Sequence, residues 1–461
     1  MKGAHIALNS NMTASGGTMI FDGPVSIGAN LLLKDTGPTG IIFLGSISSS
    51  GGSYSLTLEA PVGRISLLDT VGSLGVPLYN LTATSSNIQI SENIILSNQL
   101  SMNGPVQLLG DVTITGPTLL FSGTINGSYD LSLDAGASGS IVISNQIGNI
   151  ARVNALTFIN AGTIATQGIY ADSIIQTTAT TSTFNEFLDT TGVGGIVLTG
   201  GAFSFGGGLH TQNGGGVVIA NTGAMTAISS VDTTTSGSFV QSGAGSISWQ
   251  GTIVTRNKDI TFAGDLTLID SLSLSTGNSG AGNIVLSGLV DGLYPLSMTL
   301  GIGDLTLTGA LGSITPLADV TIYSVRNVIA NDISSLSVTQ VGGFGTGNYL
   351  GDITTTGPLG INLVSTYLDF AGAPNLLKTT GGNIVVNSIY SAINTNINPV
   401  VIELNNGLNG TLFVGSSNIG YFACPTVSAQ LLGAVRSNVP CSVKYNGTVF
   451  VPQDCPTPLI D

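Results

Sequence analysis

The sequence predicts an all-β protein, a parallel β-helix (β-solenoid) with a small C-terminal cap, and three observations lead to this prediction. A block of sequence recurs along the chain at intervals of about 80 to 100 residues. Within each block, apolar and hydroxyl residues alternate over short runs. No segment combines the 3.6-residue period of an amphipathic helix with a helix cap.

The recurring block begins near residues 41, 119 and 284, where the chain reads IIFLGSI, LLFSGTI and IVLSGLV. Three positions align in every copy, an early glycine, a tyrosine and a later glycine: Gly45, Gly123 and Gly288; Tyr54, Tyr129 and Tyr294; Gly72, Gly148 and Gly312. A short unit repeated in this way cannot bury its own apolar face, so it has to stack on its neighbours. We expect the aligned glycines at corners and the aligned tyrosines at stacking positions.

Weaker copies of the block begin near residues 196 and 384. Residues 1–420 are therefore predicted to form a solenoid of about five units of 80 to 100 residues. The pair Gly23-Pro24 and the pair Gly104-Pro105 precede a block by 18 and 15 residues. The first 40 residues thus resemble the end of a further unit, and we expect the chain to continue from other repeat sequence.

The predicted strands are short, with aliphatic side chains on one face and hydroxyls on the other, as in Leu56-Thr57-Leu58. Antiparallel sandwiches and propellers do not account for near-copies at this spacing, whereas a parallel β-helix does. With about 20 to 25 residues a turn, the chain would make about 20 turns spaced ~4.8 Å apart, a rod ~100 Å long. Burial of stacked Leu, Ile and Val stabilises such a core by ~1.5–3 kcal/mol per side chain, without any metal.

Residues 421–461 differ from the rest of the chain, because the alternation weakens, prolines accumulate and all the cysteines are found there. This segment is predicted to be the C-terminal cap that covers the open edge of the last strands. In an oxidising compartment two of Cys424, Cys441 and Cys455 would form a disulfide, and the alternative is three free thiols. Their spacing matches no zinc site.

Charged side chains are scarce: 10 are basic and 24 acidic, only 7% of the residues, and the net charge is −14. The negative charge argues against nucleic acid or an anionic membrane surface as a partner. No uninterrupted apolar run is long enough for a transmembrane helix, and the first ten residues have no secretory signal. Most of the acids are Asp, which we expect in turns, bonded to their own backbone.

The sequence offers no clear catalytic, cofactor-binding or metal-ligating residues. His5 and His210 have no Ser or Cys and acid at the spacing of a triad. The four glutamates are Glu59, Glu92, Glu186 and Glu403, and none lies in a distinctive aromatic-rich setting. Trp249 is the single tryptophan, whereas clefts that process carbohydrate commonly offer several aromatic platforms.

Two alternatives stay open. A β-helical polysaccharide lyase or hydrolase could bring acids from different turns together, beside Arg256, Lys258 and Asp259, which otherwise read as a solvated loop. An ice-binding solenoid would use rows of threonine, and Thr-x-Thr segments such as Thr82-Ala83-Thr84, Thr113-Ile114-Thr115 and Thr306-Leu307-Thr308 have the right local form. These do not recur in every predicted turn.

The run SGTINGSYDLSLDAG at 122–136, followed by IGNI at 147–150, resembles the repeats of filamentous-haemagglutinin-like bacterial surface proteins and autotransporter passengers. The resemblance covers about residues 10–420. It implies a right-handed β-helix that is exported to the bacterial surface or beyond and acts in adhesion. We therefore expect a non-catalytic rigid rod segment of an adhesin, outside the cell, with a glycan or protein of a host or neighbouring cell as partner.

In this interpretation the features that face the ligand are insertions that break the repeat, near residues 201–216 and 339–351. A structural spacer without any ligand is a further possibility. The sequence leaves the ligand itself open.

Overall fold

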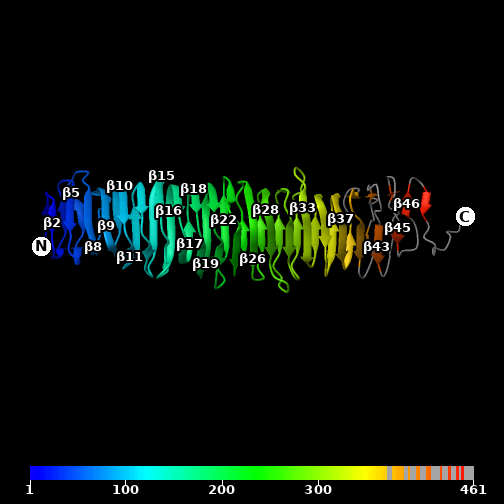
Figure 1. Ribbon diagram of the computed structural model, residues 1–461, viewed down its shortest axis with the longest axis horizontal. Coiled ribbons are helices and arrows are strands. Elements are labelled where there is room, and N and C mark those ends of the chain that lie inside the picture. Colours follow the sequence, from blue (N-terminus) through cyan, green and yellow to red (C-terminus); the bar gives the residue numbers. More distant parts are fainter. Residues whose placement is uncertain are drawn as a thin grey trace. The chain divides into compact units, whose positions relative to one another are not determined.

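The computed structural model is a β-solenoid of about 18 turns made of parallel strands, which confirms the predicted fold class. It describes residues 1–370 and 376–388 and, beyond these, only the backbone of a few short strands. No helix occurs among these residues. The chain divides into two compact units, Met1–Ser229 and Ser230–Asp461, which Figure 1 shows as stacks of short strands. Right-handed winding stays an expectation.

The strands of the first unit are β1 (Ile6–Leu8), β2 (Met12–Ala14), β3 (Met19–Phe21), β4 (Val25–Ile27), β5 (Leu31–Asp35), β6 (Gly40–Phe43), β7 (Ile47–Ser49), β8 (Leu56–Leu67), β9 (Leu78–Ile90), β10 (Ile94–Asn103), β11 (Val106–Leu108), β12 (Val112–Thr115), β13 (Thr118–Phe121), β14 (Ile125–Asn126), β15 (Leu131–Ile143), β16 (Val153–Thr166), β17 (Ile169–Gln176), β18 (Ala179–Phe184), β19 (Leu188–Gly200), β20 (Ala202–Phe205), β21 (Leu209–Thr211), β22 (Val217–Asn221) and β23 (Met225–Ala227).

The strands of the second unit are β24 (Val231–Thr235), β25 (Phe239–Gln241), β26 (Ile247–Thr255), β27 (Ile260–Phe262), β28 (Leu266–Ser275), β29 (Ile284–Leu286), β30 (Val290–Asp291), β31 (Leu296–Thr299), β32 (Leu305–Leu307), β33 (Leu317–Ser324), β34 (Val328–Ala330), β35 (Ile333–Gln340), β36 (Thr346–Tyr349), β37 (Ile353–Ser365), β38 (Tyr367–Asp369), β39 (Leu376–Thr379), β40 (Ile384–Ser388), β41 (Ile393–Asn394), β42 (Val401–Leu404), β43 (Leu412–Ser416), β44 (Thr426–Val427), β45 (Val435–Ser437), β46 (Val443–Tyr445) and β47 (Thr448–Phe450).

In the first unit, equivalent residues of successive turns pair in parallel and form columns along the stack. One column, here called the first column, runs through Met19, Ile41, Ile65, Ile88, Val106, Ile125, Ile147, Ile169, Leu188 and Leu209. Paired residues lie between 18 positions apart, as for Val153 and Ala171, and 26 apart, as for Asp134 and Asn160. The turns are therefore unequal in length, and some are shorter than predicted.

The core is a column of stacked aliphatic and aromatic side chains. Leu56 and Leu58 are buried while Thr57 between them is half-buried, so the predicted alternation places apolar residues inside. The rings of Phe21 and Phe43, one turn apart, stack with centroids 4.7 Å apart. Each such side chain contributes ~1.5–3 kcal/mol through burial, so the stack needs no metal or disulfide to be stable.

The recurring blocks do not stack in register on one another. Ile125 in the second block aligns in sequence with Ile47, yet it lies in the first column together with Ile41, the residue that starts the first block. Three full turns carry the chain from Ile41 to Val106, and the second block starts two strands later, at Leu119. The third strand after β11 returns to the first column at Ile125, so two strands make two-thirds of a turn. One repeat therefore spans three and two-thirds turns. Tyr54 precedes Leu56 and Tyr129 precedes Leu131, and these leucines belong to different columns. The prediction that the aligned tyrosines stack is therefore wrong.

The aligned glycines do lie at corners, as predicted. Gly72 and Gly148 have φ values of 72° and 71°, in the left-handed region that favours glycine. A Cβ atom at Gly148 would lie 2.0 Å from the carbonyl oxygen of Tyr170, on the next turn. The corner thus brings two backbones closer together than any side chain permits.

Many Asp and Asn side chains join one turn to the next. The Asp111 carboxylate accepts the backbone N–H of Asp130 at 2.9 Å, and Asp130 accepts that of Ala155 at 3.0 Å. Asp35, in contrast, accepts the N–H groups of Gly37 and Gly40 in its own turn. The expectation that Asp bonds its own turn is therefore right at Asp35 but incomplete, because many of these side chains satisfy the corner of the following turn.

The second unit repeats this architecture. Ile260, Ile284 and Leu305 pair in parallel along one of its columns. The Arg326 side chain donates to the Asp304 carboxylate at 2.8 Å and 2.5 Å and lowers the pKa of Asp304. Burial raises the pKa of the Tyr349 hydroxyl, which donates to the side-chain oxygen of Gln340 at 2.6 Å.

The predicted division of residues 1–420 into five units stays a prediction. Of the predicted cap, residues 421–461, only the backbone of β44 to β47 is described, and β46 pairs antiparallel with β47. The three cysteines lie outside the described residues.

Candidate functional site

The residues singled out in the sequence lie apart in the structure. The His5 Nε2 atom lies 3.0 Å from the Ser26 hydroxyl. Glu59 forms an ion pair with Lys34 at 2.8 Å. Glu92 is exposed in the loop between β9 and β10, and the side chain of Glu403 lies outside the described residues.

The possible lyase residues lie in an exposed turn between β26 and β27, which is the solvated loop of the sequence analysis. Arg256 and Lys258 are exposed there, and Asp259 accepts the backbone N–H of Asn283 at 2.8 Å. Asp259 thus completes the next corner. Trp249 is fully buried, with its ring 6.0 Å from that of Phe239, so it is a core residue and offers no platform to a sugar.

The two tracts predicted as insertions do not interrupt the strand ladder. Within 201–216, β20 pairs with β18 and β21 with β19. Within 339–351, β36 pairs with both β34 and β38. The prediction that these tracts break the repeat is wrong, because each contributes regular strands to a turn of ordinary length. Their role in facing a ligand stays a prediction.

The threonine rows are short. Thr57 pairs with Thr82, but the next residue of the row is Ser101. Thr84 is flanked by Glu59 and by Asn103, whose amide donates to the Thr84 hydroxyl at 3.3 Å. The rows therefore mix hydroxyl, amide and carboxylate groups from one turn to the next.

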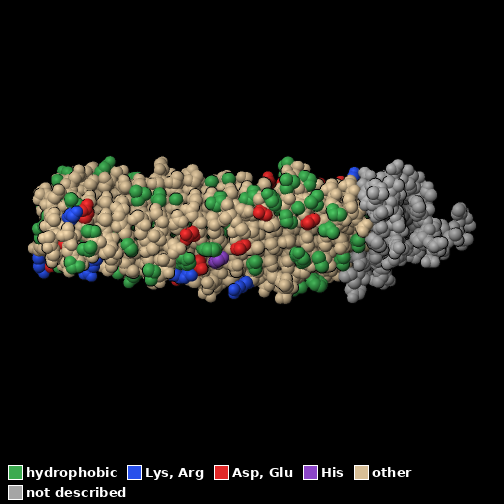
Figure 2. All heavy atoms as spheres, viewed as in Figure 1, with side chains coloured by type: hydrophobic (Ala, Val, Ile, Leu, Met, Phe, Trp, Pro, Cys, Tyr) green, Lys and Arg blue, Asp and Glu red, His purple; other side chains and the backbone are tan. Residues whose placement is uncertain are grey.

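The first unit contains one organised group of charged, aromatic and amide side chains, here called the Arg152 cluster. It consists of Gln146, Arg152, Tyr170, Glu186, Phe187, Asp189 and His210. These residues come from four consecutive turns of the same face, since Tyr170 pairs with Asp189 and Asp189 with His210. Charged side chains are sparse on the face that Figure 2 shows.

Two side-chain bridges hold the Arg152 cluster, and each spans an intervening turn. Arg152 donates to the Asp189 carboxylate at 2.7 Å and to the Asp189 backbone oxygen at 3.0 Å. Its guanidinium carbon lies 5.6 Å from the centre of the Tyr170 ring, within the range of a cation–π contact. The other bridge runs from the Gln146 amide to the Glu186 carboxylate at 2.9 Å.

Gly168 makes the second bridge possible. It occupies the turn between Gln146 and Glu186, and a Cβ atom there would lie 2.9 Å from the Glu186 carboxylate. A side chain at this position would push Glu186 away from Gln146. The missing side chain at Gly168 therefore opens the gap that the bridge crosses.

Phe187 and His210 extend the cluster by one more turn. The Phe187 ring is 46% exposed, and its centre lies 5.1 Å from that of the His210 imidazole, with 32° between the ring planes. The sequence alone draws attention to His210 and Glu186, but not to Gln146, Arg152, Tyr170, Phe187 and Asp189. Their separations of one or two turns, which vary in length, gave no recognisable motif.

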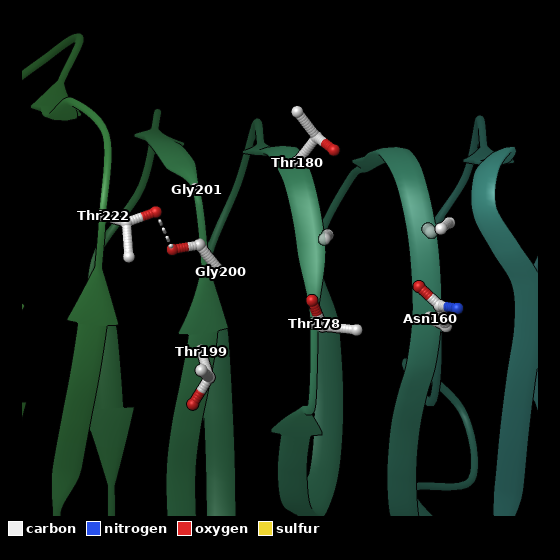
Figure 3. Close-up of a pocket in the computed structure, with 10 residues that line it drawn as sticks. Asn160, Thr178, Thr180, Thr199, Gly200, Gly201 and Thr222 are labelled. Carbon is white, nitrogen blue, oxygen red and sulfur yellow. Dashed lines mark hydrogen bonds between the residues drawn. The ribbon is translucent and has the colours of Figure 1, made fainter.

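A shallow groove of about 370 Å³ lies at another corner of the same unit (Figure 3). It is lined by small and uncharged residues: Ala137, Asn160, Ala161, Thr178, Ala179, Thr180, Thr199, Gly200, Gly201 and Thr222. The Thr222 hydroxyl donates to the backbone oxygen of Gly200 at 3.3 Å. The groove offers hydrogen bonds but no charge and no aromatic ring.

No group of three or more His, Cys, Asp or Glu side chains that could hold a metal ion occurs among the described residues. Nor does the described part of the chain contain a helix that is long and apolar enough to cross a membrane. No protein-family model, curated protein or solved structure matches the chain.

Proposed function

We propose that this chain is a non-catalytic, stiff segment of a bacterial adhesin of the filamentous-haemagglutinin-like or autotransporter-passenger kind. It would act outside the cell or on the cell surface and hold a binding surface toward a glycan or protein of a host or neighbouring cell. The observation that carries the proposal is the unbroken ladder of parallel strands that runs through the first unit. The resemblance of the repeats to those surface proteins agrees with it.

A ladder of this kind is physically suited to presenting a binding surface to a partner. Every turn hydrogen-bonds to the turns beside it and buries a shared apolar column, so bending the stack would break many contacts at once. Outward-facing side chains are held at fixed spacing, ~4.8 Å from one turn to the next. A stack of this kind can carry a preorganised group such as the Arg152 cluster without any moving part.

The competing function is an enzyme that acts on polysaccharide, and the hydrolase form of it would use two carboxylates at the site of cleavage. The Arg152 cluster contains two, Glu186 and Asp189. Gln146 already engages one and Arg152 the other. This arrangement suits a binding surface better than an acid that has to give up its proton.

The experiment that tests the proposal measures binding and cleavage on the same preparation. Fluorescently labelled chain is incubated with fixed epithelial and bacterial cells, while unlabelled chain is incubated with a polysaccharide panel and assayed for new reducing ends. We expect saturable binding to cells and no increase in reducing ends. New reducing ends would establish the enzyme instead, and the absence of both would leave a spacer.

A further inference from the structure

We propose that the Arg152 cluster is a binding site for a neutral saccharide. The sugar ring would stack on Phe187, and its hydroxyl groups would donate hydrogen bonds to the carboxylates of Glu186 and Asp189. The inference rests on the proposed adhesive function and names the class of ligand and the residues that would bind it.

The exposure of Phe187 is the first reason. The other phenylalanines of the first unit are all buried in the core: Phe21, Phe43, Phe121, Phe158, Phe184, Phe203 and Phe205. Phe187 is 46% exposed instead and lies beside the imidazole of His210. Exposing an aromatic ring forgoes the gain from burying it. A flat apolar ring beside hydrogen-bonding groups suits the C–H face of a sugar ring.

Preorganisation is the second reason. Arg152 is tied to Asp189, and Gln146 to Glu186, across intervening turns, so the carboxylates are already oriented when a ligand arrives. Little side-chain entropy remains to be lost on binding, and this loss is one of the main costs of association. Gly168 has no side chain, so the bridge from Gln146 to Glu186 can cross the intervening turn.

The charges of the cluster indicate a neutral ligand. The carboxylates of Glu186 and Asp189 repel anions, and the net charge of −14 over the whole chain acts in the same direction. The Arg152 guanidinium, placed over the Tyr170 ring and bonded to Asp189, already uses the aromatic face and one of the two carboxylates that a cation would seek. A hydroxyl-rich neutral molecule needs neither an unpaired carboxylate nor that ring face.

The test uses the full chain and three kinds of probe in titration calorimetry. The neutral probes are maltohexaose, cellohexaose and mannohexaose, the anionic probe is oligogalacturonate and the cationic probe is tetralysine. We expect at least one neutral oligosaccharide to bind, and neither charged probe to do so.

Two variants locate the binding. Phe187→Ala should weaken it about tenfold, the equivalent of ~1.4 kcal/mol. Glu186→Gln keeps the shape of the side chain and should weaken it several-fold. Phe344→Ala, which removes an exposed phenylalanine of the second unit, is the matched control and should leave binding unchanged. Thermal unfolding confirms that each variant is folded before its binding is compared.

Three results would overturn the inference: no binding of any neutral oligosaccharide at millimolar concentration, equal weakening by Phe187→Ala and Phe344→Ala, or binding of a charged probe that depends on Phe187. Cell binding distinguishes failure of the saccharide-site inference from failure of the proposed adhesive function. If no neutral oligosaccharide binds but the chain adheres to cells, the saccharide site is wrong while adhesion stands. If saccharide binds but no cell does, the proposed adhesive function is wrong.

Discussion

Two glycines of the first unit separate the effect of backbone conformation from that of contact between turns. Gly136 and Gly148 have nearly the same left-handed φ, 72° and 71°. A Cβ atom at Gly136 would meet nothing within 4 Å. At Gly148 it would lie 2.0 Å from the Tyr170 carbonyl oxygen, one turn further along the stack. Alanine substitutions at the two positions therefore share the cost of a left-handed backbone conformation. Only the substitution at Gly148 adds the cost of a clash with the next turn.

The shared cost is the left-handed conformation of an alanine, ~1–2 kcal/mol. At Gly148 the neighbouring backbone also has to move away, and overpacking of this kind costs a further ~1–3 kcal/mol. We expect Gly136→Ala to lower the free energy of unfolding by ~1–2 kcal/mol and Gly148→Ala by ~2–5 kcal/mol. The difference measures how closely the turns approach each other.

Urea unfolding of the full chain, followed by far-ultraviolet circular dichroism, gives the two free energies. Because a repeat protein can unfold in parts, hydrogen exchange of the peptides around residues 147–170 supplies a local measurement. Exchange there should accelerate in Gly148→Ala and change much less in Gly136→Ala. Equal destabilisation by the two substitutions would refute the close inter-turn contact at this corner.

Three further predictions concern acid stability and the core. Arg326 lowers the pKa of Asp304, so the ionised carboxylate stabilises the fold above its unfolded-state pKa, and this contribution is lost as the pH falls through the lowered folded-state value. Asp304→Asn should accordingly flatten the acid limb of thermal stability between pH ~2 and ~5, and an unchanged limb would contradict this. Leu131→Ala should cost ~2–5 kcal/mol in urea unfolding, whereas Leu74→Ala, at a side chain that is 90% exposed, should stay within ~0.5 kcal/mol; similar losses would count against the core. The fluorescence of Trp249, which is fully buried, should resist quenching by acrylamide in the folded chain, and ready quenching would show that the core is wrong there.

The fold class could be predicted from the sequence because its signals are local. The alternation Leu131-Ser132-Leu133 indicates from three residues alone which side chains face the core, and both leucines are buried in the structure. The corner role of Gly148 could be predicted because the same glycine recurs in each block. Neither inference needs the length of a turn.

The register between turns could not be predicted, because turn length varies from 18 to 26 residues in the first unit. The repeat does not span a whole number of turns, so Tyr54 and Tyr129 precede strands of different columns. The same variation hid the turn-to-turn hydrogen bonds of Asp111 and Asp130, whose partners lie 19 and 25 residues away.

The Arg152 cluster could not be predicted from the sequence for a related reason. Arg152 and Asp189 are 37 residues apart and belong to turns that are not neighbours. Phe187 precedes the buried Leu188, so in the sequence it reads as part of a core strand. Outward-facing positions compared at spacings of one and two turns would have found the group, once the register was known.

The central claim is that successive turns stack in parallel with the register described, and disulfide trapping tests it most directly. Thr57 and Thr82 face outward on adjacent turns and pair directly, and Ser101 continues the row. Adjacent turns lie ~4.8 Å apart, within the ~4.4–6.8 Å between Cα atoms that a disulfide bridges, whereas two turns are ~9.6 Å apart. The variants Thr57→Cys/Thr82→Cys and Thr57→Cys/Ser101→Cys are prepared with the native cysteines replaced by serine, oxidised and compared on a non-reducing gel. Rapid crosslinking of the first pair and none of the second is the predicted result; equal crosslinking, or crosslinking of the second pair alone, would contradict the parallel stack.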